Sequence, residues 1–461
     1  MSIVAAYALP HPPLIIPEIG RGEERKIRNT IAAYMEVSRR IALLDPDVIV
    51  ISTPHSVMYQ NYIHISPGTK AGGDFGRFGC PDVGFMVDYD SELASLLSAK
   101  AIASEIAAGM EGEREKSLDH GVMVPLFFIK KNLQDFKLVR ISLSGLSLLD
   151  HYRLGRLVQE ATEELNRKVV FIGSGDLSHK LKINGPYGFA PEGPAFDKLI
   201  TDILESGDFD RLLSIDQQLS EKAAECGLRS FAMMAGALDG KDIEKELLSY
   251  EGPFGVGYAV MAYAVNADNP NRRFAEKEAK RLESEIEDIR VNEDEFVRLA
   301  RMSLEYYQKN HKHLPKPSNL GVDLLSKKGG VFVSIKLDGQ LRGCIGTIAA
   351  TTDSLADEII QNAVSAGFRD PRFDHVSKSE LARLVYSVDV LEKAEPVSSM
   401  LDLDPKRYGI IVRCKGKSGL LLPDLEGVDT PEEQLKIALR KGNISPEDDY
   451  QLERFVVTRH H

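Results

Sequence analysis

The sequence has few cysteines and no long apolar run, and both absences exclude classes of protein. Its cysteines include no CxxC pair; they are Cys80, Cys226, Cys344 and Cys414. The sequence therefore predicts neither a disulfide framework nor a zinc-finger site, and we expect free thiols in a reducing compartment. No apolar run reaches the length of a membrane-spanning helix, and the start, "MSIVAAYALPHPP", lacks the features of a signal peptide. These features predict a cytoplasmic protein that does not interact with a membrane.

The chain also lacks an excess of positive charge. Its formal net charge of -12 at pH 7 argues against generic nucleic-acid binding, which needs clustered Lys and Arg to contact phosphates. With 43% hydrophobic and 27% charged residues, the composition is that of a packed globular protein. A chain of 461 residues is too long for one typical core, so we expect two domains.

Short apolar segments alternate with helical patterns in the first part of the chain. Residues 2–9, 47–53, 136–144 and 168–174 are rich in β-branched side chains and apolar on both faces. Strands covered on both sides of a parallel or mixed sheet have this character. Residues 24–44 carry apolar side chains at helical spacing. The alternation predicts an α/β domain, with a mixed sheet and flanking helices.

The pattern changes after residue 267. Residues 268–290 are rich in charged side chains and predict a solvent-exposed connecting helix. We therefore place the first domain at residues 1–267 and the second at residues 291–461.

The second domain shows local signals of hairpins and helices. Asp338 and Gly339 lie between two β-like runs and predict a hairpin turn. Thr430, with Glu433 three residues later, predicts a capping box at the start of a helix that ends at Gly442. The second domain is therefore expected to be α+β.

Three histidines directly follow predicted strands of the first domain. "YALPHPP" places His11 after the first strand, "VISTPHS" places His55 after the second, and "GSGDLSH" places His179 after a later one. Ligand sites of open α/β sheets form beyond the carboxyl ends of the strands, so we expect these histidines at one functional site. His120, in "LDHGVMVPLFF", precedes a further apolar run. Two others lie inside strand-like and helical patterns and are expected to be structural: His64 and His151.

Two histidines and an acidic residue can form a metal site. Iron(II) that activates O₂ needs two imidazoles and one carboxylate on one face, and His11 and His55 can supply the nitrogens. The segment "LSEKAAECGLRSFAMMAGALDG" offers Glu221, Glu225 and Cys226. Neighbours on a helix point about 100° apart, so Glu225 and Cys226 are not expected to bind the same ion. In the structural alternative, Glu225 is solvated and Cys226 is a small core residue.

Five segments span most of residues 1–265: "HPPLIIPEIG", "ISTPHS", "LDHGVMVPL", "GSGDLSHKL" and "ECGLRSFAMMAGAL". In order and spacing they resemble the class III extradiol dioxygenase (LigB-like) superfamily, to which the Memo-like proteins also belong. The resemblance implies that His11 and His55 bind a non-haem iron(II) and that a late acidic residue completes the triad. It also implies that His179 is an acid/base residue beside the metal and that His120 lies over the substrate.

The resemblance leaves two candidates for the third ligand. The Memo-like branch has a cysteine before a glycine, which lines up with Cys226, and a D-x-x-H loop that resembles Asp176 and His179. Ring-cleaving members use a glutamate, which Glu225 can supply. We favour Glu225, because a hard carboxylate suits iron(II) in an O₂-binding site better than a lone thiolate. We expect Fe(II), with Zn or Cu as alternatives.

The segment "LRGCIGT" (341–347), together with "AVSAGFRDPRF", "VDVLEKAEPV" and "YGIIVRCKGKSGLLLP", resembles the AMMECR domain across residues 290–461. Its motif residues are Arg342, Gly343, Cys344 and Gly346. In one interpretation, Arg342 favours the thiolate of Cys344 and the two form a small polar site. In the other, the glycines allow close backbone packing, Cys344 is buried and Arg342 pairs with an acid such as Asp370.

These resemblances predict a metal-dependent oxidoreductase, similar to the extradiol dioxygenases, that acts on an aromatic or catecholic substrate. The alternative is a non-oxygenase metal-binding protein of the AmmeMemoRadiSam system, which works with a radical-SAM partner in a modification pathway. The chain has no CxxxCxxC motif, so radical-SAM chemistry would need another polypeptide. The sequence is also compatible with a homo-oligomer.

Overall fold

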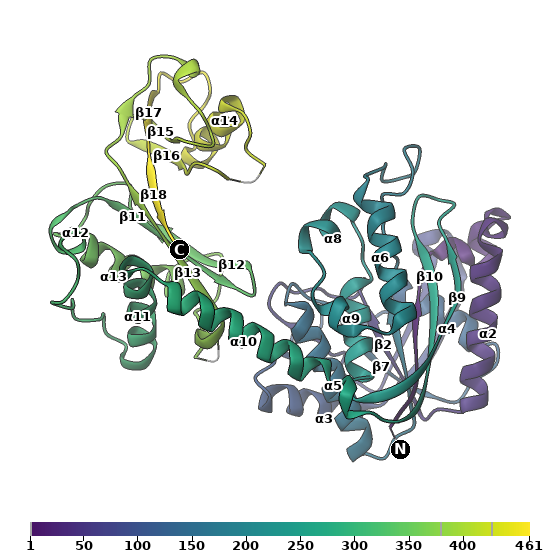
Figure 1. Ribbon diagram of the computed structural model, residues 1–461. Coiled ribbons are helices and arrows are strands. Elements are labelled where there is room, and N and C mark those ends of the chain that lie inside the picture. Colours follow the sequence, from purple (N-terminus) through teal and green to yellow (C-terminus); the bar gives the residue numbers. More distant parts are fainter. Residues whose placement is uncertain (1, 379, 426) are drawn as a thin grey trace. The chain divides into compact units, whose positions relative to one another are not determined.

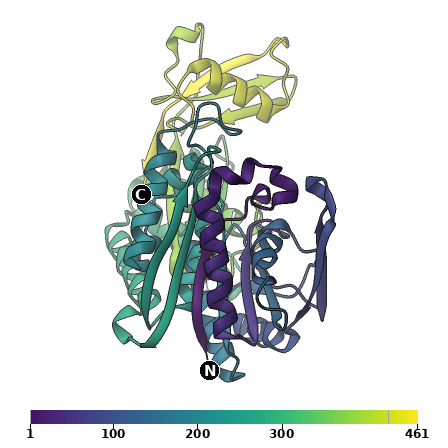
Figure 2. The ribbon, with the colours of Figure 1, turned by 90° about the vertical axis from the view of Figure 1, so that its right-hand side faces the viewer.

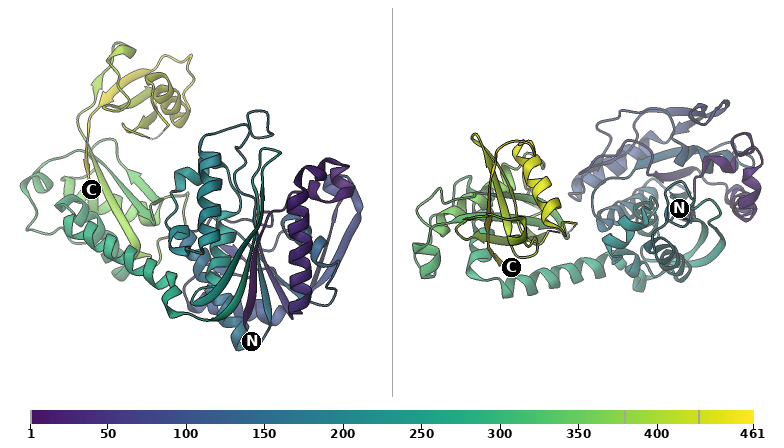
Figure 3. Two further views of the ribbon diagram at one scale, coloured as in Figure 1. Left: turned by 45° about the vertical axis from the view of Figure 1, so that its right-hand side comes forward. Right: turned by 90° about the horizontal axis from the view of Figure 1, so that it is seen from above.

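The computed structural model describes residues 2–378, 380–425 and 427–461. It divides into two compact units, Met1–Lys280 (unit 1) and Arg281–His461 (unit 2) (Figure 1). The boundary lies within helix α10 (Phe274–Asn292), which is coloured teal to green in Figure 3 and overlaps the predicted connecting helix. The domain boundaries at residues 1–267 and 291–461 stay a prediction.

Unit 1 is built on a mixed sheet with the strand order β4-β5-β7-β2-β8-β1-β10-β9. Its strands are β1 (Ile3–Leu9), β2 (Val48–Thr53), β4 (Lys70–Phe75), β5 (Cys80–Tyr89), β7 (Lys137–Ser142), β8 (Val169–Ser174), β9 (Lys241–Glu251) and β10 (Tyr258–Asp268). β5, β7, β2, β8 and β1 run parallel, whereas β4, β10 and β9 pair antiparallel. The central strands β1, β2, β7 and β8 confirm the four predicted apolar strands. A short parallel pair, β3 (Ile63–His64) and β6 (Ala108–Gly109), lies beside the sheet.

Helices cover both faces of this sheet, as the predicted α/β class requires. They are α1 (Pro17–Gly20), α2 (Arg28–Leu44), α3 (Ser91–Ala103), α4 (His120–Ile129), α5 (Leu148–Glu164), α6 (Glu192–Ser206), α7 (Phe209–Leu213), α8 (Gln217–Ala223) and α9 (Leu228–Ala237). One core packs α3, α5, α6 and α9 against the sheet, and the other packs α2 and α4 against the opposite face. Each central strand is thereby buried on both sides.

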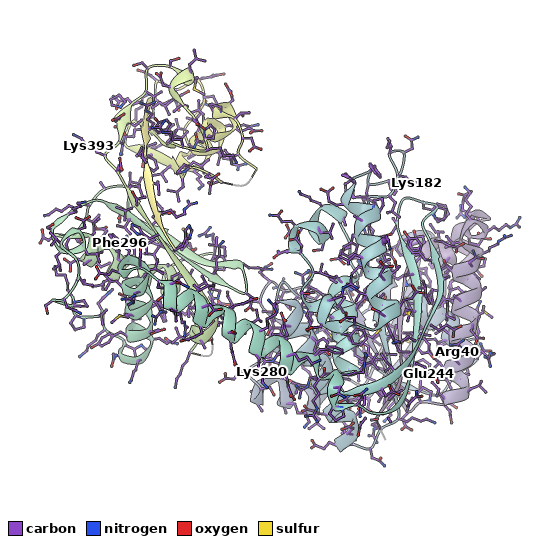
Figure 4. All side chains as sticks on the ribbon, in the orientation of Figure 1. Arg40, Lys182, Glu244, Lys280, Phe296 and Lys393 are labelled. Atoms are coloured by element: carbon purple, nitrogen blue, oxygen red, sulfur yellow. The ribbon has the colours of Figure 1, made fainter. Side chains whose placement is uncertain are left out.

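Helix α2 lies along the strands near one edge of the sheet, where it is the purple helix of Figure 2. Its Arg40 guanidinium lies 2.8 Å from a carboxylate oxygen of Glu246 on β9. Figure 4 labels Arg40 of α2 and Glu244, which lies on β9 two residues before Glu246. None of the helices in the described part of the chain combines the length and apolar character needed to cross a bilayer.

Unit 2 contains two antiparallel sheets, with the orders β12-β11-β13-β18 and β14-β17-β15-β16. The strands are β11 (Gly330–Leu337), β12 (Gln340–Gly346), β13 (Leu384–Leu391), β14 (Glu395–Pro396), β15 (Gly409–Cys414), β16 (Lys417–Leu421), β17 (Gln451–Phe455) and β18 (Val457–His460). The helices are α11 (Glu295–Asn310), α12 (Val322–Ser326), α13 (Leu355–Phe368) and α14 (Pro431–Gly442). The predicted hairpin joins β11 to β12, and the predicted capping box of Thr430 and Glu433 begins α14. The α+β class is confirmed.

Candidate metal centre

Four histidines gather where the parallel strands of unit 1 end. His11 follows β1, His55 follows β2, His179 follows β8, and His120 is the first residue of α4. The Nε2 atoms of His11 and His55 lie 2.9 Å apart. The ring of His120 stacks on that of His55, with 4.0 Å between the ring centroids. Carboxyl ends of parallel strands share one edge of a sheet, which explains why residues far apart in sequence meet here.

The thiol of Cys226 lies in the same cluster. Its Sγ is 3.7 Å from Nε2 of His11, and one ligand atom each of His11, His55 and Cys226 lie within 4.8 Å of one another. A second group with this spacing contains Asp176, His179 and again Cys226. His11 is buried and His55 is exposed, so solvent reaches the cluster from the side of His55. Both groups can hold a metal ion.

Each donor–donor distance is compatible with a shared ion, but the two pairs correspond to different angles at that ion, and 2.9 Å between two imidazole nitrogens is also an ordinary hydrogen-bond length. Two nitrogens that each lie ~2.0–2.1 Å from an ion are about 2.9 Å apart at a right angle. The two Nε2 atoms are 2.9 Å apart. A thiolate at ~2.3 Å and a nitrogen at ~2.1 Å from an ion are about 3.6 Å apart at the tetrahedral angle. The observed distance between Cys226 Sγ and His11 Nε2 is 3.7 Å.

Glu225, which the sequence favoured as the third ligand, is not brought into either group. Its Oε2 accepts a hydrogen bond of 2.6 Å from the backbone N–H of Leu228, in the first turn of α9. Glu225 and Cys226 lie between α8 and α9, so the expectation that they share a helix is wrong. Helix α8 ends at Ala223, and the next residue, Ala224, has a left-handed φ of 53° that redirects the chain. Glu221 lies on α8, where it accepts a hydrogen bond from Gln217.

Asp176 connects the chain segments that follow β1 and β8. Its Oδ1 accepts a hydrogen bond of 2.8 Å from the backbone N–H of His11. Its own backbone N–H donates to Sγ of Cys226 at 3.3 Å. Burial raises the pKa of Asp176 to about 7. The carboxyl group can therefore hold or release a proton near neutral pH.

The imidazoles of the site are neutral at neutral pH. Burial, reinforced by the neighbouring His55, lowers the pKa of His11 well below its usual range, and the same two causes lower the pKa of His120 to about 3. Partial burial of the ring lowers the pKa of His179 and also that of His55, whose ring nitrogen faces the cluster although the residue is exposed on its other side. Neutral imidazole is the form that binds metals. Burial raises the pKa of the Cys226 thiol well above its usual range, so the binding of a metal ion would have to displace its proton.

Two aromatic side chains border the site, and the sequence reasoning missed both. Tyr187 stacks on the ring of His179, with 5.0 Å between centroids, and Phe78 meets the ring of His120 edge-on at 5.3 Å. Phe78 lies between β4 and β5, more than forty residues away from His120 in sequence, so no local pattern indicates it. Phe78 and Tyr187 therefore place apolar ring surface next to the imidazoles of His120 and His179.

The two histidines expected to be structural lie outside both groups. Nδ1 of His64 lies 3.0 Å from the carbonyl oxygen of Glu111. His151 is buried on α5, with Nδ1 2.8 Å from the carbonyl oxygen of Ser147. Nε2 of His151 also lies near the backbone N–H and the hydroxyl of Ser144, at 3.2 and 3.4 Å.

The AMMECR motif forms part of β12 in unit 2. Arg342 pairs with an acidic residue, as the packing interpretation expected, but that residue is Glu380 and not Asp370: Nε of Arg342 lies 2.6 Å from Oε1 of Glu380. Asp370 instead binds Arg372 at 2.6 Å and accepts the backbone N–H of Cys344 at 2.9 Å. Both carboxylate oxygens of Glu380 accept hydrogen bonds from the Arg342 guanidinium.

Close backbone packing requires the glycines of the motif, as the second interpretation of the AMMECR motif proposed. A Cβ atom on Gly343 would lie 2.1 Å from the carbonyl oxygen of Ala366 on α13, and one on Gly346 would lie 2.2 Å from the ring of Phe332. Cys344 is half-buried rather than buried, and its Sγ accepts a hydrogen bond of 3.2 Å from Ser334. The backbone of β12 therefore lies directly against α13.

Comparison with known proteins finds two families in this chain. Residues 5–261 match the family described as the catalytic LigB subunit of aromatic ring-opening dioxygenase, and residues 297–460 match AMMECR1. A protein of Clostridium acetobutylicum is 44% identical over 469 aligned residues, which cover 100% of this chain and 99% of the relative. A protein of Thermotoga maritima is 44% identical over 172 residues, which cover 37% of this chain and 99% of the relative.

Two solved structures are also similar to parts of the chain. An uncharacterized protein from Pyrococcus horikoshii is 31% identical, with a TM-score of 0.33, and the match covers 36% of this chain and 88% of the other. An uncharacterized protein from Escherichia coli K12 is 15% identical, with a TM-score of 0.38, and the match covers 56% of this chain and 99% of the other. The family matches, with the Clostridium relative that spans the whole chain, show that this protein belongs to the LigB family, in a form that also carries an AMMECR1 domain.

Proposed function

We propose that unit 1 binds a transition-metal ion through Nε2 of His11, Nε2 of His55 and Sγ of Cys226, and that this centre carries the function of the protein. The convergence of these three donor atoms within 4.8 Å supports the proposal. Neutral imidazoles and a cysteine thiolate are common ligands of Zn, Cu and Fe. A bound ion would polarise a substrate oxygen or a water molecule.

The ligand set favours a non-oxygenase metal-binding protein over a ring-cleaving dioxygenase. Iron(II) oxygenases of the facial-triad type use a carboxylate as the third ligand. The carboxylate of Glu225 is held at the first turn of α9 by the N–H of Leu228, whereas Sγ of Cys226 lies 3.7 Å from His11. A partner protein, such as the radical-SAM protein that the resemblance implies, would then supply or receive the substrate.

A second candidate, an Fe(II)-dependent dioxygenase that acts on an aromatic or catecholic substrate, is favoured by the residues around the ion site. The neutral imidazole of His179 lies beside the cluster and can accept a phenolic proton. Asp176, with its pKa of about 7, can hold that proton nearby. The rings of Phe78 and Tyr187 offer apolar surface to a flat substrate.

Metal analysis of ligand variants separates the two candidates. The full-length protein is purified anaerobically, and its Fe, Zn and Cu contents are measured in wild type and in Cys226→Ser, Glu225→Gln and Glu221→Gln. We expect Cys226→Ser to lose most of the metal, whereas Glu225→Gln and the matched control Glu221→Gln retain it. Retention in Cys226→Ser with loss in Glu225→Gln would reverse the assignment and favour the dioxygenase.

Activity assays complete the test. Wild type is loaded with Fe(II) and mixed with catechol and O₂, and O₂ consumption and the absorption spectrum are followed. The non-oxygenase assignment predicts neither O₂ uptake above the rate of free Fe(II) nor ring-cleavage product. Catalytic O₂ uptake that disappears in His179→Ala would establish the second candidate.

A further inference from the structure

Ser174, the last residue of β8, is fully buried next to His11. Its Oγ lies 2.9 Å from Nδ1 of His11 and 2.5 Å from the carbonyl oxygen of Gly121. A carbonyl oxygen can only accept a hydrogen bond, and a serine hydroxyl has a single proton to donate. The hydroxyl therefore donates to Gly121, and its oxygen has to accept the Nδ1 proton of His11.

We propose that Ser174 is a positioning residue that holds His11 in the tautomer with the proton on Nδ1 and an unprotonated Nε2. This inference rests on the proposed function, because Nε2 is the atom assigned to the ion. A neutral imidazole binds a metal only through its unprotonated nitrogen, and the hydrogen bond of the other nitrogen decides which one that is. Nε2 of His11 faces Nε2 of His55 at 2.9 Å and Sγ of Cys226 at 3.7 Å.

The acceptor of the Ser174 proton is itself held in place. Gly121 lies in the first turn of α4, and a Cβ atom there would lie 2.4 Å from Oγ1 of Thr53. Thr53, the last residue of β2, donates a hydrogen bond of 2.6 Å to Oδ1 of Asp119, just before the same helix. The ends of β2 and β8 are thus both connected to the start of α4. The carbonyl of Gly121 cannot turn away without disturbing this packing.

The tautomer can be observed in the metal-free protein. Full-length protein labelled with ¹⁵N-histidine is treated with chelator, and the ring nitrogens are recorded by long-range ¹H–¹⁵N NMR, with His11→Gln used to assign the signals of His11. We expect the protonated nitrogen of His11 to be Nδ1 in wild type. In Ser174→Ala we expect the proton to move to Nε2 in a substantial fraction of molecules.

Zinc affinity gives the second measurement. Zn²⁺ binding to the full-length protein is measured by competition with a chromophoric chelator in wild type, Ser174→Ala and Ser52→Ala. We expect Ser174→Ala to raise Kd roughly 10–100-fold, the usual effect of losing such an outer hydrogen bond. Ser52 is a matched control, because it is also fully buried at the end of a central strand and its Oγ lies 2.8 Å from Ser230, away from any ring nitrogen. We expect Ser52→Ala to change Kd less than about twofold.

The two measurements keep this inference separate from the proposed function. An Nε2-protonated His11 in the wild-type apoprotein overturns the role of Ser174, and so does a Ser174→Ala variant with unchanged tautomer and Kd. If wild type binds no stoichiometric zinc, the proposed metal site fails, yet the NMR comparison still decides whether Ser174 sets the tautomer. A change in Kd for Ser52→Ala as large as that for Ser174→Ala would also overturn the inference, since the effect would then be general loosening of the strand ends.

Discussion

His151 is a buried histidine of α5 whose two ring nitrogens are both occupied in the neutral form. Its Nε2 accepts a hydrogen bond of 3.2 Å from the backbone N–H of Ser144, and its Nδ1 donates to the carbonyl oxygen of Ser147 at 2.8 Å. A second proton on Nε2 would break the hydrogen bond from the N–H of Ser144 and would leave the hydroxyl oxygen of Ser144, at 3.4 Å, as its acceptor. Burial lowers the pKa of His151 to about 4. We therefore predict that this residue makes unit 1 less stable in acid.

The magnitude follows from linkage between protonation and folding. An unfolded histidine has a pKa of about 6.5, so the difference from the folded value of about 4 corresponds to about 3 kcal/mol. The folded pKa is the lower one, so the unfolded state takes up the proton first as the pH falls. The contribution of His151 to the free energy of unfolding is complete above pH ~6.5 and is lost as the pH falls to ~4.

The prediction is tested by comparing wild type with His151→Gln in the full-length protein. Because the chain has no tryptophan and has two units, unfolding in urea is followed by hydrogen exchange of unit 1 peptides at several pH values between 7 and 4. Wild type should lose about 3 kcal/mol more than His151→Gln over this range. A control variant, His313→Gln, changes an exposed histidine of unit 2 and should follow wild type. Parallel curves for wild type and His151→Gln would refute the reasoning.

Two further predictions concern the metal site and the AMMECR motif. His179→Ala should retain the metal content of wild type and, if the protein is an oxygenase, lower its turnover about 10²–10⁴-fold; loss of metal would instead make His179 a ligand. Gly343→Ala should destabilise unit 2 by about 1–3 kcal/mol, because the added Cβ would lie 2.1 Å from the carbonyl oxygen of Ala366. Calorimetry of the full-length variant checks this, and an unchanged unfolding temperature for unit 2 would contradict the packing argument.

Local patterns in the sequence were sufficient to predict much of the fold. The apolar, β-branched runs became β1, β2, β7 and β8, because a strand covered on both faces is made mostly of apolar side chains. The hairpins β4–β5 and β9–β10, which extend the sheet, were not predicted; β4, β5 and β9 are partly exposed and lack the continuous apolar character of the central strands. The capping box of α14 was predicted from residues within one turn, where the interaction is wholly local.

The sequence by itself also determined that His11, His55 and His179 would meet, since each directly follows a strand and parallel strands end at one edge of the sheet. The third member of the cluster was decided only by the tertiary structure. Glu225 and Cys226 are adjacent in sequence, and the left-handed turn at Ala224 directs the chain so that the carboxylate binds α9 while the thiol approaches His11. The sequence cannot show which of two adjacent side chains points toward the cluster, because this depends on one backbone dihedral angle and on the packing of the next helix.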